Sequence, residues 1–229
     1  MDPFKIAELT VAEAALARRA TRHFDSTRPI PEALLTRILH LATLAPSGYN
    51  LQPWRFLVVR TEANRKKLKA CAYNQPKIGE APVLVIVLGY HFPERSHLDA
   101  IIATTQTLGA MTPEIAAETR ARTKTTMERV VDRPLWTMRS TMLSVATMML
   151  AAESLGVSSA PMEGFDSEKV KEAFGVPDDH TVCALVALGY SNTVKHFPGR
   201  LGLSDVCYEE HFGQPWSLGE DPGDEDSGS

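Results

Sequence analysis

The chain has 229 residues, of which 44% are hydrophobic, and its formal net charge is −4. This apolar content supplies one sizeable core, so we expect a single domain over residues 1–216. The acidic balance argues against a general nucleic-acid surface, because phosphate neutralisation requires clustered Lys and Arg.

The first half of the chain mixes helical and extended patterns. Helices are predicted over residues 7–19, 31–45 and 65–72, and strands over residues 55–60 and 83–89. Pro46 ends the second helix.

The second half is helical from residue 98 to 156, with breaks at Pro113 and Pro134. Its last helix is apolar nearly all round, which predicts burial on several faces by its own core, a partner subunit or both. After Gly156 we expect a short loop, a helix over residues 167–174 and a strand over residues 182–188. Without regular βαβ spacing, this order favours an α+β fold with a small, mostly antiparallel sheet flanked by helices.

The C-terminal part changes in composition. Residues 197–216 have little apolar mass of their own and are free to lie across another subunit. Residues 217–229 form an acidic tail poor in apolar residues, which is typical of a disordered segment.

Arg18 and Arg22 are the first candidates for chemistry. Four residues apart, they project from one side of the chain if this turn is helical. Two converging guanidinium groups suit a phosphate. The alternative is a solvated helix end, where cations complement the helix dipole.

The loop over residues 45–54 (APSGYNLQPW) is dense in hydrogen-bonding side chains and fixed by two prolines. Ser47, Asn50 and Gln52 supply donors and acceptors for a heteroaromatic ring or a phosphate. An ordinary helix-to-strand connection is an equal alternative.

The segment over residues 158–166 (SSAPMEGFD) follows the apolar helix. Gly164 permits close backbone approach to a flat ligand, with the carboxylate of Glu163 beside it. Asp166 or Ser167 is also suited to cap the following helix, and the two roles are compatible.

The chain resembles the nitroreductase family of flavoproteins over nearly its whole length, from Arg18 to Arg200. The resemblance is carried by segments in the family's order and spacing: residues 18–25 (RRATRHFD), 46–54 (PSGYNLQPW), 74–77 (NQPK), 160–166 (APMEGFD) and 199–201 (GRL). It implies an intertwined homodimer with exchanged C-terminal arms, and two FMN molecules bound in the dimer interface.

The resemblance also implies site residues. Arg18, Arg22 and Arg200 correspond to the cradle of the FMN phosphate, and Asn74 and Lys77 to contacts with the pyrimidine edge. The full set expected to bind the cofactor is Arg18, Arg19, Ala20, Arg22, Pro46, Ser47, Gly48, Asn50, Gln52, Asn74, Lys77, Pro161, Met162, Glu163, Gly164 and Arg200.

No side chain is expected to act as an acid. The resemblance places a backbone N–H of Glu163 or Gly164 near flavin N5, and gives Lys77 the role of tuning the ring electronically. Ser47, Gly48 and Asn50 resemble the loop that one subunit contributes to the flavin held by the other. Two positions depart from the family pattern: Ala20 replaces a usual serine, and Pro198 replaces a frequent basic residue.

Other motifs are absent or weak. No GxGxxG follows a strand, so the nucleotide has no Rossmann site, which agrees with a ping-pong scheme in which donor and acceptor share one pocket. His91 and His97, with Glu94 between them, suit no common zinc site and are expected to be solvated. No metal is expected. Residues 142–152, the longest apolar run, are too short to span a membrane.

The cysteines indicate where the protein works. Cys71, Cys183 and Cys207 are widely separated, form no CxxC pair and are expected to be ordinary thiols. With no apolar signal stretch near the N-terminus, this favours a cytoplasmic location.

The function implied is reduction of nitroaromatics, quinones or a similar small electron-poor acceptor by FMN and NADH or NADPH. Specialised flavin chemistry, such as reductive dehalogenation or oxidative ring processing, is an alternative on the same fold. A flavin-binding storage or sensing protein with little turnover is a second alternative. The excursion over residues 92–134 is expected to cover the pocket and decide its specificity.

Overall fold

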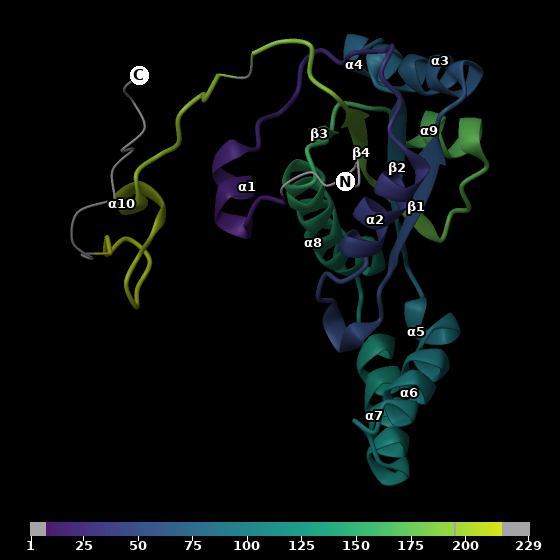
Figure 1. Ribbon diagram of the computed structural model, residues 1–229. Coiled ribbons are helices and arrows are strands. Elements are labelled where there is room, and N and C mark those ends of the chain that lie inside the picture. The colour runs from purple at the N-terminus through teal and green to yellow at the C-terminus, as the bar shows by residue number, and fades with distance from the viewer. Residues whose placement is uncertain (1–7, 195, 217–229) are drawn as a thin grey trace, which may run out of the picture. The chain divides into compact units, whose positions relative to one another are not determined.

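The computed structural model of the chain describes residues 8–194 and 196–216. The contacts divide the chain into two compact units, Met1–Lys195 and His196–Ser229. The large unit contains the sheet and all three clusters of buried apolar side chains (Figure 1).

A four-stranded antiparallel sheet forms the centre of the large unit, in the order β1-β2-β4-β3. The strands are β1 (Trp54–Val59), β2 (Val83–Tyr90), β3 (Ser158–Met162) and β4 (His180–Gly189). Trp54 pairs with Gly89 at one end of the sheet, and Val83 pairs with Leu188 at the other. The predicted α+β fold with an antiparallel sheet is thereby confirmed.

The two central strands are buried on both faces, which explains their unbroken apolar sequences. In β2, Ile86 belongs to one apolar cluster, whereas Val85 and Val87 belong to the other. The register shifts beyond Val87, where Cys183 is an extra residue in β4.

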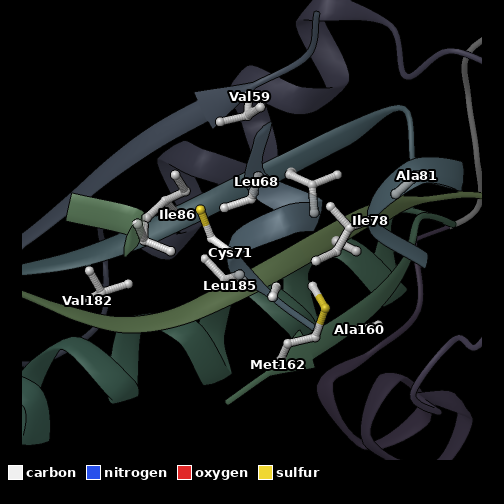
Figure 2. Close-up of a cluster of buried hydrophobic side chains, with 14 of the residues drawn as sticks. Val59, Leu68, Cys71, Ile78, Ala81, Ile86, Ala160, Met162, Val182 and Leu185 are labelled. Carbon is white, nitrogen blue, oxygen red and sulfur yellow. The ribbon is translucent and has the colours of Figure 1, made fainter. Parts of the chain in front are cut away.

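Three helices cover one face of the sheet: α3 (Glu62–Cys71), α4 (Pro76–Glu80) and α9 (Ser167–Phe174). Figure 2 shows Leu68 and Cys71 of α3 and Ile78 of α4 packed over Ile86 and Leu185. The helix predicted over residues 167–174 is confirmed. α3 begins at Glu62, three residues earlier than predicted, because the Thr61 hydroxyl caps it by accepting from Asn64 N at 3.3 Å.

Two helices cover the opposite face: α2 (Glu32–Ala42) and α8 (Arg133–Ser154). Their contact includes a buried hydrogen bond of 2.8 Å from the Ser144 hydroxyl to the Ala42 carbonyl oxygen. The Thr43 hydroxyl donates to the His40 carbonyl at 2.7 Å. These hydroxyls satisfy the last carbonyls of α2, which ends three residues before its predicted limit.

The apolar helix α8 is buried on one side only within this chain. Val145 and Met148 are fully buried between α2 and the sheet. Leu135 and Leu143, on other sides of the helix, are 43% and 48% exposed. The predicted burial on several faces is therefore only partly met by the protein's own core.

The excursion between β2 and α8 forms three helices with a small core of their own: α5 (Pro93–Ser96), α6 (Leu98–Thr107) and α7 (Pro113–Glu128). Leu98 and Ile102 pack with Met127 and with Leu51 of the loop before β1. This third apolar cluster packs the excursion against the loop before β1.

The first helix is shorter than predicted. α1 (Val11–Ala17) begins after Thr10, whose hydroxyl accepts from Glu13 N at 3.3 Å while Thr10 N donates to the Glu13 carboxylate at 2.7 Å. This reciprocal capping box fixes the start of the helix. The helix stops at Ala17 because Arg18 is extended. Ala7, the predicted first residue, lies outside the described residues.

β3 corrects the short loop expected after α8. Among the four strands of the sheet it pairs with β4 alone and is therefore an edge strand, where Pro161 can be accommodated without a ladder hydrogen bond. A proline within five residues hid the strand from pattern reading, although Ala160 and Met162 are buried.

The described part of the small unit contains the short helix α10 (Leu203–Val206) and a bridge between Tyr208 and Pro215. No residue of its described part, 196–216, is buried, and Phe212 is 91% exposed. The predicted acidic tail, residues 217–229, lies outside the described residues. None of the described helices combines the length and apolarity needed to cross a membrane.

Candidate functional site

The segment carrying Arg18 and Arg22 is extended, which corrects the predicted helical turn. Ala20 forms a parallel bridge with Ser159 of β3, and Thr21 N donates to the Ser159 carbonyl at 3.1 Å. Ala20 and Arg22 are exposed on either side of buried Thr21, so they point away from the core. Ala20 and Arg22 are thus exposed on the same side because alternate residues of an extended segment point the same way, and not because the segment is a helical turn.

The arginines of this segment differ in their contacts. Arg19 donates to the carbonyls of Leu16 and Arg18 at 2.5 and 3.0 Å, which closes the end of α1. Arg18 and Arg22 form no ion pair within the described part of the chain. Two cations without a carboxylate partner on one exposed segment can neutralise an anion.

Glu80 joins this segment to α4. Its carboxylate accepts from Phe24 N at 3.0 Å and lies 3.2 Å from His23 Nδ1. The residues just after Arg22 are therefore held beside the helix that carries Lys77.

The start of α4 contacts the end of β3. Gln75 Nε2 donates to the Gly164 carbonyl at 2.7 Å, and Asp166 N donates to the Cys71 carbonyl at 2.9 Å. Tyr73 and Asn74 reach this position through left-handed backbone conformations, with φ of 51° and 57°. The structure thus brings the predicted Asn74–Lys77 and Glu163–Gly164 segments together, 89 residues apart in sequence.

Lys77 is a half-buried cation at this junction. Burial lowers the pKa of its ammonium group, because desolvation disfavours the charged form. It has no ion-pair partner among the described residues. A ligand that brings negative charge to this position would offset the desolvation of Lys77.

The loop before β1 has a strained, internally bonded shape. Tyr49, Asn50 and Gln52 all have positive φ, and Gln52 N donates to the Ser47 hydroxyl at 2.9 Å. A side chain at Gly48 would place its Cβ 3.2 Å from the Trp136 ring. The loop therefore packs closely against α8 at Gly48.

This loop lies at the far end of the sheet from the Arg18–Arg22 segment. The loop leads into Trp54, which pairs with Gly89 at the end of β2. The arginine segment adjoins Ser159 of β3, and Ser159 pairs with Leu188 of β4. Leu188 also pairs with Val83, the first residue of β2. The rise along β2 separates the two ends by about 20 Å.

Arg200 lies in the small unit. Its Nη1 donates to the Gly199 carbonyl at 2.6 Å, and its guanidinium lies 5.6 Å from the Phe197 ring centroid. It forms no ion pair within the described residues. Its exposure and unpaired charge are those expected of an anion-binding side chain.

Several contributors to the site escaped sequence reasoning. Gln75 and Glu80 organise the junction of α4, β3 and the arginine segment. Gln75 stands inside the NQPK motif, which was a usable signal. Glu80 carries no local signal, because its partners lie 56 residues or more away in sequence.

The histidines correct one expectation, because they are half-buried and not solvated. His91 Nε2 lies 2.8 Å from the Thr181 hydroxyl, and burial lowers the pKa of its imidazole. His97 is hydrogen-bonded on both ring nitrogens. Within the described residues, no group of three His, Cys, Asp or Glu side chains is arranged to hold a metal.

The thiols carry no sign of nucleophilic activation. Cys71 and Cys183 are buried, and burial raises the pKa of both, that of Cys183 to about 12. A thiol with a raised pKa is a poor nucleophile near neutrality.

Comparison with known proteins gives a consistent result. The family model described as the nitroreductase family matches residues 15–190. An NADH dehydrogenase of Thermus thermophilus is 35% identical over 204 residues, covering 86% of this chain and 95% of that protein. An oxygen-insensitive NAD(P)H nitroreductase of Enterobacter cloacae is 27% identical over 217 residues, covering 88% and 100%. A crystal structure from Exiguobacterium sibiricum, provisionally assigned as a nitroreductase in complex with FMN, has a TM-score of 0.84 at 26% identity, covering 90% and 99%.

Proposed function

The chain belongs to the nitroreductase family and is an NAD(P)H-dependent flavin oxidoreductase, and from this premise we propose that two copies of it bind FMN at their interface. We further propose that this homodimer reduces nitroaromatics, quinones or similar small electron-poor acceptors. Residues 1–216 form the FMN-binding domain in this proposal. The E. sibiricum structure with FMN supports the choice of flavin.

The unpaired cations of the chain fit a phosphate. Arg18, Arg22 and Arg200 have no carboxylate partner among the described residues, and a phosphate brings about −1.5 to −2 charges at neutral pH. Guanidinium groups suit it because each presents a planar fork of charged donors. We therefore assign these arginines to the phosphate of FMN. Ala20 beside them supplies no hydroxyl group, so in the proposal the charged arginines supply the contacts that bind the phosphate.

The observation that carries the proposal is the contact between α4 and the end of β3. Because Gln75 bonds to the Gly164 carbonyl at 2.7 Å, Lys77 and Glu163 are held on neighbouring segments. In the proposal, Asn74 and Lys77 bind the pyrimidine edge of the flavin, and Glu163 and Gly164 present a backbone N–H to its reactive centre. Lys77 supplies positive charge where a flavin becomes more negative on reduction.

The second copy completes the site. The loop carrying Ser47, Gly48 and Asn50 lies about 20 Å along the sheet from the arginine segment, by the rise of β2. We propose that each copy contributes this loop to the cofactor held by the other. The exposed Leu135 and Leu143 of α8 support an apolar contact between the copies.

FMN, when bound, would supply the chemistry that carries a hydride from NADH or NADPH to the acceptor. The residues of this chain position the cofactor and its partners. No side chain at the proposed reactive face needs to donate a proton.

An anaerobic absorbance spectrum tests the proposal. The purified protein, or protein supplied with FMN, is expected to be yellow and dimeric, to bleach with NADH or NADPH, and to regain colour when a nitroarene or quinone is added. Failure to take up FMN in excess would refute the proposal. Flavin that stays oxidised with both nucleotides would instead support a binding protein with little turnover.

A further inference from the structure

A relay of hydrogen bonds connects β1 to the loop before it through His97. Arg55 Nη2 lies 2.5 Å from His97 Nε2, and His97 Nδ1 lies 3.0 Å from the carbonyl oxygen of Leu51. The other end of the guanidinium is fixed by a 2.9 Å hydrogen bond from Arg55 Nη1 to the Trp54 carbonyl. The imidazole is therefore held between a donor and an acceptor.

The partners fix the protonation state of His97. A guanidinium can only donate hydrogen bonds, so His97 Nε2 must accept. A carbonyl oxygen can only accept, so His97 Nδ1 must donate. The relay therefore needs the neutral imidazole with its proton on Nδ1, and a second proton on Nε2 would face the Arg55 cation.

The surroundings of His97 give an imidazolium no counter-charge. From β2, the ring of Tyr90 lies 6.3 Å from the His97 ring and 5.3 Å from the Arg55 guanidinium carbon. From β4, His180 stacks on Tyr90 and bonds to its own neighbour Asp179 at 2.7 Å. None of these groups offers a carboxylate to His97.

The carboxylates of the excursion that carries His97 are paired elsewhere. Glu94 pairs with Arg133 at 3.0 Å, and Asp99 pairs with Arg120 at 2.7 Å. Among the described residues no carboxylate lies within ion-pair distance of His97. His97 also lines an open groove of about 540 Å³.

The carbonyl that His97 holds lies at the most constrained point of the loop. Leu51 stands between Asn50 and Gln52, which both have positive φ. Its side chain is fully buried with Leu98, the residue after His97. The side chain of Leu51 and its carbonyl are thus both fixed by the excursion, the first by packing and the second by His97.

We propose that His97 is a positioning residue: its neutral imidazole, oriented by Arg55, holds Leu51 and so keeps the loop over residues 46–52 in the shape that contacts the cofactor of the other subunit. Removing the imidazole takes away the acceptor for Arg55 and the donor to Leu51, and so loosens the loop. This inference rests on the proposed function, since the loop is there assigned to FMN. It makes the affinity for FMN depend on a residue that does not touch the cofactor.

The test compares His97→Gln, whose amide supplies one donor and one acceptor, with His97→Leu, which supplies neither. Hydrogen exchange at the amides of Asn50, Leu51 and Gln52, measured without FMN and corrected for intrinsic rates, reports the order of the loop. His97→Leu is expected to accelerate this exchange, and to raise the dissociation constant of FMN, each by about fivefold to tenfold, as for one lost hydrogen bond. His97→Gln is expected to stay within about twofold of the wild type.

Rescue by the conservative variant is a readout that a merely structural role would not give. His97→Gln is expected to keep the loop protection and the FMN affinity of the wild type, whereas His97→Leu loses both. If His97→Leu fails to fold, Arg55→Leu, which removes the donor to His97 Nε2, takes its place and is expected to accelerate exchange in the same loop. His91→Leu is the matched control, because His91 bonds to Thr181 and not to the loop.

Two failures are distinguishable. Wild-type protein that binds FMN normally, with loop exchange unchanged in His97→Leu or Arg55→Leu, overturns the role of His97 and leaves the proposed function standing. Wild-type protein that binds no FMN overturns the proposed function, and the inference built on it, whatever the loop does.

Discussion

Replacing Lys77 with methionine removes a charge while keeping an apolar stem of similar reach. Lys77 is half-buried on α4 and has no ion-pair partner among the described residues, and burial lowers the pKa of its ammonium group. The protein therefore keeps a partly desolvated cation without compensation. Such a group binds an anionic or electron-rich edge through a charge-assisted hydrogen bond.

The size of the effect follows from the environment of Lys77. A hydrogen bond to a charged group contributes about 1.5–3 kcal/mol, so the dissociation constant of FMN should rise about 10-fold to 150-fold. The charge added to a flavin on reduction interacts with a cation at 4 Å by about 1 kcal/mol in water and about 4 kcal/mol near a protein surface. Losing that interaction lowers the two-electron midpoint potential by about 20 to 90 mV, at about 30 mV for every 1.4 kcal/mol.

Fluorescence titration with FMN measures the first quantity, and equilibration with reference dyes measures the second. Lys66→Met is the matched control, because Lys66 is an exposed residue of α3 in a surface ion pair with Glu62. An unaltered potential in Lys77→Met would refute the assignment of Lys77 to the pyrimidine edge. A loss in Lys66→Met as well would mean that net charge alone sets the affinity.

Three further changes test the fold. Gly189→Ala places a Cβ 2.6 Å from Pro82, so it should lower the free energy of unfolding by about 1–3 kcal/mol in urea denaturation, and an unchanged midpoint would contradict this close packing. Arg133→Leu removes the nearer cation from the buried Glu94 carboxylate, at 3.0 Å, and leaves only the exposed Arg95 at 3.9 Å, so it should destabilise by about 3 kcal/mol, whereas a loss below about 1 kcal/mol would show the pair to be dispensable. Burial raises the pKa of Cys183 to about 12, so the unfolded chain loses this proton first and stability falls as pH rises. Between about pH 9 and 11 the wild type should lose about 1.4 kcal/mol per pH unit more than Cys183→Ala, and equal slopes would contradict the burial of this thiol.

Local patterns predicted most elements of the sheet and its helices. The run over residues 182–188 lies within β4, and α9 has the predicted bounds, because Asp166 caps it and Gly175 ends it in a left-handed conformation. β3 escaped because Pro161 masks a strand that only its pairing with β4 defines. Tertiary pairing, which a single sequence does not display, decided that element.

The candidate site shows the same division. Residue types pointed to Lys77 and Gly164, whereas the hydrogen bond from Gln75 that joins their segments depends on folding across 89 residues of sequence. The relay from Arg55 through His97 had no sequence signal, and His97 was expected to be solvated. The role of a side chain that depends on its neighbours in the folded chain cannot be predicted from the spacing of residues in the sequence.

Two independent features of this chain support the proposed homodimer. The arginine segment and the loop over residues 46–52 lie about 20 Å apart along the sheet, and in the proposal they reach one cofactor from different copies. Separately, α8 leaves Leu143 48% exposed, and residues 196–216 contain no buried side chain of their own. In the proposed dimer, one contact between the copies would bury the apolar surface and complete the site. A variant such as Leu143→Lys should weaken dimerisation and FMN binding together in sedimentation and fluorescence measurements, because the charge would be desolvated in the contact. FMN bound with undiminished affinity by a monomeric Leu143→Lys would separate the two features and contradict the shared site.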